Sequence, residues 1–310
     1  VDINHTEYAK DEIRKMIRSN KKWFYTIGFH KPHLPYYAPK RFFDIFKDYY
    51  IVPPTTTMNE SLGPFRQAFK MEDSQYKMTT PIHDHPTMMK AYYATVAMID
   101  EQIGKLLKLL EDEDRVDSTT VVLTSDHGFS TGVHGIWAKH SVLESATHVP
   151  FIVRDSRFAP GSTYAPTELL DLVPTLMDLS NLEVGNIQTL DGVSLRPLLE
   201  RTQTSVKQYA RSVFRKFRTM IYSKRFVRYR TMKRGKWQAL VDYKTDPLES
   251  VNLIDIRRSR RRSRTSGDWL YRKLSRARLI RNPRSRRRAI DSSFSQGFSE
   301  CCYRFVKHRK

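Results

Sequence analysis

The sequence predicts an α/β fold, in which a largely parallel sheet is flanked by helices, followed by a small antiparallel subdomain. The first observation is that apolar runs typical of buried strands alternate with helical periodicity through residues 1–200. Strands separated by helices tend to pair in parallel, because a crossover helix returns the chain to the same end of the sheet. The second is a change near residue 213 to short alternating segments, which is typical of antiparallel hairpins.

Each element of the α/β part has its own signature. Residues 21–29 form an apolar, aromatic-rich run that predicts a strand. Residues 119–125 and 149–153 are predicted as two further strands, and residues 169–179 as a helix. The clearest helix follows Pro86, where apolar side chains recur every three or four residues: Met89, Tyr92, Val96, Ile99, Ile103, Leu106 and Leu110.

Composition divides the chain into three predicted parts: the α/β domain over 1–200, the antiparallel subdomain over 201–256, and a basic tail over 257–310. Residues 201–310 carry 33 Lys and Arg against 7 Asp and Glu, whereas residues 1–200 carry 21 against 26. The tail is predicted to be disordered, because it has too few apolar residues to offset its ordering entropy. Such a tail can bind polyanions, but it lacks the spaced aromatic residues of a sequence-reading nucleic-acid-binding protein.

Cysteines and apolar runs exclude other classes. The only cysteines, Cys301 and Cys302, are adjacent, which predicts neither a disulfide framework nor a cysteine metal site. No apolar run is long enough to predict a membrane span. The sequons at Asn4 and Asn59 are compatible with glycosylation in the secretory pathway.

Polar residues follow the predicted strand at 119–125. Asp126 offers the hard oxygen that Ca²⁺ or Mg²⁺ prefers, and His127 could coordinate a cation or donate a hydrogen bond to an anion. Lys139, a short distance along the chain, could place an ammonium group on an oxyanion. The alternative is that Asp-His-Gly is an ordinary turn after a strand. Ligands gather at the carboxyl ends of strands in α/β sheets, which favours a site here.

A second candidate constellation is Gly-Phe-His-Lys-Pro-His-Leu-Pro at residues 28–35. His30 comes directly after the predicted strand at 21–29, and the prolines restrict the loop that holds it. An imidazole near neutral pH could give a proton to a leaving alkoxide as a general acid. The alternative is a loop histidine whose nitrogens are satisfied by backbone groups.

These two stretches resemble motifs of the type I sulfatase family, most of all its iduronate-2-sulfatase subfamily. The 28–35 stretch is similar to the subfamily's signature loop, and Ser-Asp-His-Gly with Gly-x-His-Gly-x-Trp-Ala-Lys to its second signature block. Further similar segments follow in the family's order at residues 146–150, 170–176, 190–195 and 244–253.

The resemblance implies an alkaline-phosphatase-like fold that hydrolyses sulfate esters, with one Ca²⁺ in the complete site. It implies that Asp126 and His127 bind the metal, that Lys139 and His134 bind the sulfate substrate, and that His30 serves the leaving group alongside Lys139 as a catalytic residue. The implied substrates are uronate 2-sulfates of heparan or dermatan sulfate, and the implied location is the lysosome or secretory pathway.

The chain also departs from the family pattern. The family's nucleophile, a cysteine matured to formylglycine in a Cys-x-Pro-x-Arg motif, belongs to an N-terminal half that is absent here, as do two metal-binding aspartates. Val133 stands where the family usually has glutamate. We therefore expect an inactive C-terminal fragment that needs the missing half. The alternatives are a related sulfatase with another substrate, a sulfatase-like protein that only binds, and a polyanion-binding protein acting through the tail.

Overall fold

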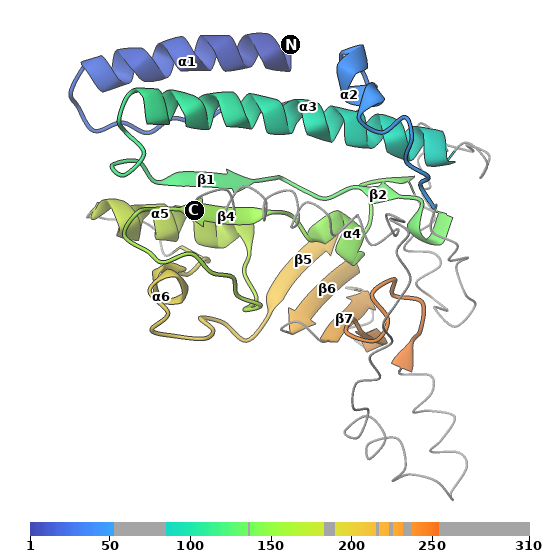
Figure 1. The fold of residues 1–310 in the computed structure, drawn as a ribbon. Coiled ribbons are helices and arrows are strands. Elements are labelled where there is room, and N and C mark those ends of the chain that lie inside the picture. The colour runs from blue at the N-terminus through green and yellow to red at the C-terminus, as the bar shows by residue number, and fades with distance from the viewer. Residues whose placement is uncertain are drawn as a thin grey trace, which may run out of the picture.

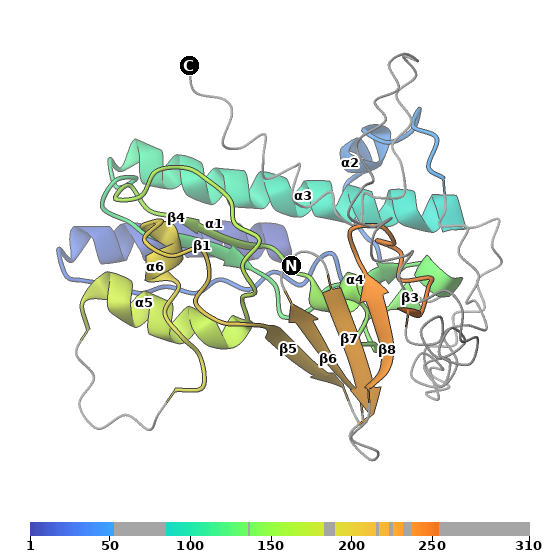
Figure 2. The same cartoon turned by 90° about the horizontal axis from the view of Figure 1, so that it is seen from below.

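A computed structural model describes residues 1–52, 85–135, 137–182, 190–214, 217–222, 226–231 and 237–253. The elements form three layers (Figures 1 and 2). Helices α1 (Asp2–Arg18) and α3 (His85–Asp112) lie on one side of strands β1 (Val121–Thr124) and β4 (Phe151–Arg154). Helices α5 (Leu172–Ser180) and α6 (Arg196–Leu199) lie on the other side. This helix–sheet–helix arrangement confirms the α/β class.

The long helix α3 confirms the predicted apolar stripe. Three of its stripe residues, Met89, Ile99 and Leu110, are buried. Leu109 and Leu110 pack with Ile13 of α1, which the sequence did not indicate as a helix. The short helix α2 (Lys40–Asp44) packs Phe42 on the same long helix. None of the helices within the described ranges is long and apolar enough to cross a bilayer.

The predicted parallel pairing of strands is not found among the strands that the structure describes. β1 and β4 pair antiparallel, with Thr124 opposite Phe151, and every other described strand pair is antiparallel too. The chain leaves the end of β1, makes a small hairpin and the short helix α4 (Glu144–Thr147), and returns at the same end of the sheet. Because no long helix carries it to the far end, β4 must run in the opposite direction.

The run at 21–29 is extended but is not a strand. Its residues alternate between half-buried and exposed, as a strand's would, and Trp23 and Tyr25 pack against the α1–α3 cluster. The backbone has no ladder partner in the described part of the chain.

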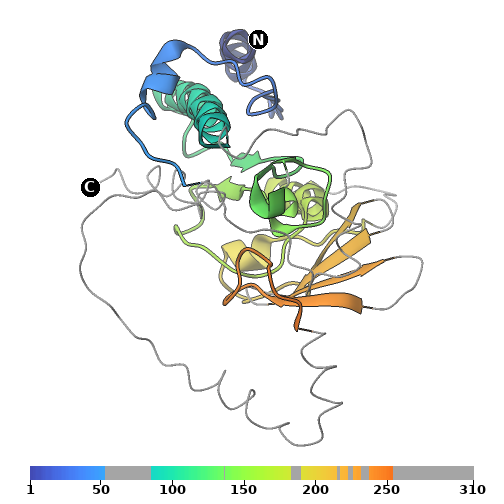
Figure 3. The same ribbon diagram turned by 90° about the vertical axis from the view of Figure 1, so that its right-hand side faces the viewer.

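The C-terminal subdomain is the predicted antiparallel sheet. Its strands are β5 (Ala210–Phe214), β6 (Phe217–Tyr222), β7 (Phe226–Thr231) and β8 (Trp237–Asp242), paired in that order. Figure 3 shows this sheet on the side of the molecule away from α1 and α3. The proposed domain boundaries stay a prediction, and the tail at 257–310, Cys301, Cys302 and Asn59 lie outside the described residues.

Candidate active site

Asp126 and His127 leave the end of β1 in a tight turn. The Asp126 side chain is 83% exposed, and its Oδ1 accepts a hydrogen bond from the His127 backbone N–H at 3.0 Å. His127 Nδ1 lies 2.8 Å from the Gly128 carbonyl, which makes it the donor, so a neutral ring presents the lone pair of Nε2. That Nε2 lies 3.3 Å from Asp126 Oδ2. An imidazole nitrogen and a carboxylate oxygen therefore converge on one side of the turn.

Helix α4 supports this turn from behind. The Gly128 N–H donates to the Ala146 carbonyl at 2.9 Å, and Ser130 Oγ lies 2.6 Å from Ser145 Oγ. A Cβ on Gly128 would stand 2.3 Å from the Ser145 carbonyl oxygen, so only glycine fits this close approach. The glycine of Asp-His-Gly is thus required by the backbone of α4.

A small hairpin lies between the Asp126–His127 turn and Lys139 in the chain. β2 (Ser130–Thr131) pairs antiparallel with β3 (Trp137–Ala138), with Ser130 opposite Ala138. Lys139 follows directly after β3, where Ala138 has a φ of 80° and the extended backbone ends. The hairpin is anchored by the buried Trp137, whose Nε1–H donates to Nε2 of His85 at 3.2 Å. The pairing of Ser130 with Ala138 holds together two residues that are three positions from His127 and one from Lys139, and a shared site for His127 and Lys139 stays a prediction.

The loop that carries His30 is held by a carboxylate from the chain's first turn. The buried Asp2 accepts the backbone N–H of His30 at 2.8 Å and that of Lys31 at 3.1 Å. The exposed His30 ring lies 4.9 Å, centroid to centroid, from the ring of His33. Further along the loop, Tyr36 makes an edge contact with Phe129 at 6.5 Å, which connects this loop to the segment after His127.

His134 lies elsewhere in the hairpin, in the short helix η4 (Val133–Gly135), and is buried. Burial lowers its pKa, while a hydrogen bond with the Leu248 backbone and the charge of Asp246 act in the opposite direction. Both of these residues belong to the turn that follows β8. The placement favours a role in docking that turn, and substrate binding by His134 stays a prediction.

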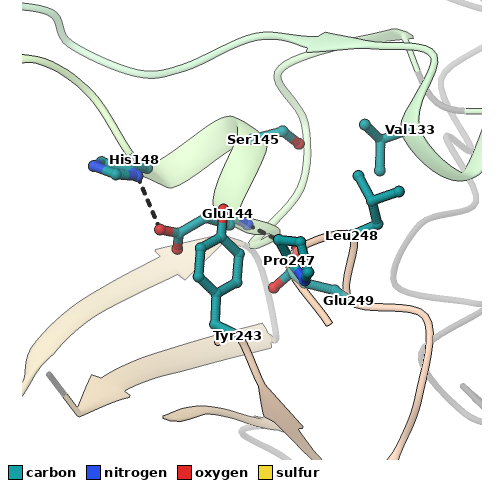
Figure 4. A pocket seen from close by; sticks show the side chains of 8 residues that line it. All are labelled: Val133, Glu144, Ser145, His148, Tyr243, Pro247, Leu248 and Glu249. Atoms are coloured by element: carbon teal, nitrogen blue, oxygen red, sulfur yellow. Dashed lines mark hydrogen bonds and ion pairs between the residues drawn. The ribbon is translucent and has the colours of Figure 1, made fainter. Parts of the chain in front are cut away.

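A pocket opens between α4 and the same turn (Figure 4). Glu144, His148, Tyr243, Leu248 and Glu249 contribute to its lining. Its volume is about 30 Å³, enough for one or two water molecules rather than a ligand. Glu144 Oε1 pairs with His148 Nδ1 at 2.9 Å, and the buried Glu249 accepts the Glu144 backbone N–H at 3.1 Å. This pocket lies at the contact between α4 and the segment after β8, and it is too small to be a substrate cleft.

Sequence reasoning missed Asp2, Glu144 and Glu249. Asp2 stands two residues from the start of the chain, where nothing pairs it with a loop near residue 30. Glu249 lay inside a segment noted for its resemblance, but no spacing rule pairs it with a helix 105 residues away. Only the fold brings Asp2 and Glu249 to the backbone amides that they accept from, and Glu144 to the backbone and side chain that it contacts.

The residues present form part of a divalent-cation site. Asp126 and His127 supply two convergent donor atoms, whereas Ca²⁺ takes six to eight oxygen ligands. Within the described ranges no group of three or more His, Cys, Asp or Glu side chains is placed to hold a metal. By itself this set does not complete the coordination shell of a divalent metal, because too few anionic oxygens converge.

The first predicted glycosylation sequon lies on helix α1. Asn4 is exposed, while the hydroxyl of Thr6 is buried and donates to the Asp2 carbonyl.

Comparisons with known proteins agree on one family. The sulfatase family profile matches residues 2–182. Choline-sulfatase of Rhizobium meliloti is 28% identical over 76% of this chain and 47% of its own length. Human iduronate 2-sulfatase is 33% identical over 52% of this chain and 31% of its own length. The chain thus spans about half or less of the curated relatives it matches.

Solved structures show the same fold. A phosphonate monoester hydrolase of Agrobacterium radiobacter superposes with a TM-score of 0.67 at 21% identity, over 87% of this chain and 60% of that one. A second such hydrolase, from Silicibacter pomeroyi, gives a TM-score of 0.66 at 22% identity over the same shares. At these identities the likeness supports the fold and leaves the substrate open. With its family profile covering more than half of the sequence and its α/β fold matched, the chain belongs to the sulfatase family.

Proposed function

We propose that this chain is the C-terminal part of a sulfuric ester hydrolase that removes the 2-sulfate of uronates in heparan or dermatan sulfate. The observation that supports it best is the turn at the end of β1, where Asp126 Oδ2 and His127 Nε2 lie 3.3 Å apart. A carboxylate oxygen and an imidazole nitrogen suit a divalent cation, and such a cation, with the ammonium of Lys139, would offer positive charge to the oxygens of a sulfate ester. The identity to human iduronate 2-sulfatase supports the substrate.

In this proposal each predicted residue has a separate task. Lys139 binds the sulfate oxygens and neutralises the charge that develops on them as the S–O bond breaks. His30, exposed on a loop held by Asp2, gives a proton to the departing sugar oxygen. His134 is proposed to contribute to substrate binding indirectly, because its contacts with Asp246 and Leu248 hold the hairpin that precedes Lys139.

Sulfatases as a family bind a divalent metal. We propose Ca²⁺, because Asp126 supplies a hard carboxylate oxygen, and His127 is its partner in this chain. When bound, such a cation supplies positive charge for the sulfate oxygens. The remaining ligands and the covalent nucleophile are proposed to come from the N-terminal half that relatives possess. A lysosomal or secretory location is part of the same proposal.

A chimera tests the function. The N-terminal half of human iduronate 2-sulfatase, with its cysteine matured, is joined to residues 1–256 of this chain. We expect turnover of a uronate 2-sulfate disaccharide in preference to choline sulfate and aryl sulfate, and none by residues 1–310 alone. An aryl phosphonate monoester is tested alongside these sulfates, because a phosphonate monoester hydrolase has the same fold.

Three results would contradict the proposal or its substrate. Turnover of the phosphonate but of no sulfate ester would replace the reaction. Metal-dependent sulfate hydrolysis by residues 1–310 alone, lost on Asp126→Ala, would show that no second half is needed. Preference for choline sulfate would keep the reaction and replace the substrate.

A further inference from the structure

Helix α4 stands between the Asp126–His127 turn and the C-terminal subdomain. On one side, the carbonyls of Ser145 and Ala146 contact Gly128, the residue after His127. On the other, the backbone N–H of Glu144, the first residue of the helix, donates to Glu249 Oε2 at 3.1 Å. Figure 4 shows Glu249 approaching α4 from the segment that follows β8. One short helix therefore connects the turn with residue 249.

Helix α4 depends on outside partners, because it has only four residues. The first amides of any helix have no partner within it, and a side chain at the N-cap normally accepts from them. Here the N-cap is Leu143, which makes no side-chain cap hydrogen bond. Glu249 supplies the missing acceptor from 105 residues further along the chain. Glu249 is therefore one of the outside partners that hold this helix in place.

The segment that delivers Glu249 is itself well determined. Asp246 begins it: its backbone N–H donates to the Asp242 carbonyl at 2.9 Å, and its Oδ2 accepts from Val251 N at 2.7 Å. Glu249 N–H donates to the Asp246 carbonyl at 3.1 Å, and the Glu249 side chain is buried. A turn held at three places presents the carboxyl group at one position with little freedom.

We propose that Glu249 is a positioning residue for Asp126 and His127, and that docking of the 242–253 turn on α4 sets the conformation of their turn. The route runs from Glu249 Oε2 to Glu144 N, along the single turn of α4, and from Ala146 O to Gly128 N. The significance of the route rests on the proposed function of Asp126 and His127. The structural coupling can be measured without it.

The chemistry of the contact sets the choice of variants. Burial raises the pKa of Glu249 well above its ordinary value, and the nearby Glu144 carboxylate adds to this, so the neutral acid is favoured. Glutamine is neutral, has the same length and keeps an acceptor oxygen, so Glu249→Gln preserves the cap. Glu249→Ala removes it. Asn252→Ala is the matched control, because the Asn252 side chain accepts from the backbone N–H of Leu240 in β8.

Hydrogen exchange of the full 310-residue chain, read by mass spectrometry on peptides over 126–131 and 142–148, tests the proposal. We expect Glu249→Ala to speed exchange in both peptides by about tenfold, since one net hydrogen bond is lost from a coupled unit. Glu249→Gln should match the parent in both. Asn252→Ala should speed exchange near residue 240 and leave 126–131 unchanged.

Different responses of the two peptides would contradict the proposal. If Glu249→Ala speeds exchange at 142–148 but not at 126–131, the turn is independent of the cap and the proposal is wrong. If Glu249→Ala does not fold, the Asp126–His127 turn is changed instead and exchange in α4 is measured, because an energetic coupling between two sites is reciprocal. Gly128→Ala, whose Cβ would meet the Ser145 carbonyl, should then speed exchange at 142–148, whereas Gly104→Ala, with open space around it, should not. No change in 142–148 would overturn the proposal. None of these readouts depends on sulfatase activity, so the chimera can fail without affecting them.

Discussion

Lys207 places its ammonium Nζ 2.6 Å from Oδ1 of Asp171, a carboxylate that is completely buried. The same ammonium lies 2.7 Å from Glu168, while Asp171 also accepts the backbone N–H groups of Glu168 and Val193. Lys207 comes just before β5, and Asp171 ends the short helix η5 (Leu169–Asp171). The pair therefore joins the entry to the C-terminal sheet with the helical layer beneath β1 and β4.

This pair leads to the first prediction. Lys207→Met should lower the free energy of unfolding by about 3 kcal/mol, because it leaves Asp171 buried without its cation. Lys40→Met is the control: its partner Asp44 is in an exposed pair, so the change should stay below about 0.5 kcal/mol. Urea unfolding followed by circular dichroism measures both. Equal effects of the two substitutions would show that the buried pair adds nothing special.

A second prediction concerns Gly192, in the loop that reaches Asp171. A Cβ there would lie 1.9 Å from the Leu170 carbonyl oxygen and 2.9 Å from the Asp171 backbone nitrogen. Gly192→Ala should therefore destabilise by more than about 2 kcal/mol, because backbone must shift. Gly104→Ala in α3 has open space around it and should stabilise by about 1 kcal/mol through helix propensity. Thermal melts of the two variants should move in opposite directions.

A third prediction is a pH dependence of stability. Burial, and secondly the Glu144 carboxylate, raise the folded-state pKa of Glu249 above its ordinary 4.5. The folded chain thus keeps a proton that the unfolded chain releases, so this contribution is present below about pH 4.5 and is lost as pH rises through the folded pKa. Glu249→Gln should flatten the fall in melting temperature above pH 4.5.

His148 provides the control for that experiment. Its hydrogen bond with Glu144 raises its pKa above the ordinary 6.5, so its contribution is present below pH 6.5 and is lost above the folded value. Its side chain is 65% exposed, so the effect should be smaller than that of Glu249. His148→Ala should lower the melting temperature by a constant amount below pH 6.5 and change the slope of the pH profile only above pH 6.5. A change of slope between pH 4.5 and 6 in that variant would mean that Glu249 is not the titrating group.

A fourth prediction concerns Lys139 in the chimeric enzyme. Lys139→Ala should lower kcat/KM by about 10²-fold, the range for loss of one preorganised charge-stabilising group. Lys90→Ala, at an exposed lysine of α3 that donates to the Lys47 carbonyl, should leave it near the parent value. Initial rates on one sulfate ester suffice. A loss under threefold in the Lys139 variant would remove it from the sulfate-binding role.

The fifth prediction separates the role of His30 from simple loop packing. Loss of a general acid should matter more when the leaving group is poor, so His30→Ala should reduce turnover of an alkyl or sugar sulfate more than that of an activated aryl sulfate. Asp2→Ala, which frees the loop backbone, is the comparison and should affect both substrates alike through misplacement. The same loss on both substrates for His30→Ala would remove it from the acid role.

The sequence alone determined the elements whose signals are local. Apolar spacing of three and four predicted α3, and period-two alternation predicted β6, β7 and β8 close to their observed bounds. The six motif blocks led to the sulfatase family, which the profile match confirms. These predictions succeed because helix and strand periodicities, and ordered motifs, are properties of neighbouring residues.

Only the tertiary structure decided how those elements meet. The direction of β4 relative to β1 depended on the path of residues 125–150, and the extended run at 21–29 has no described ladder partner despite its strand-like alternation. The partners of Asp2, Glu249 and Lys207 could not be predicted either. A buried carboxylate must be matched by amides or a cation, but the residues that supply them are set by long-range packing, which no local spacing records.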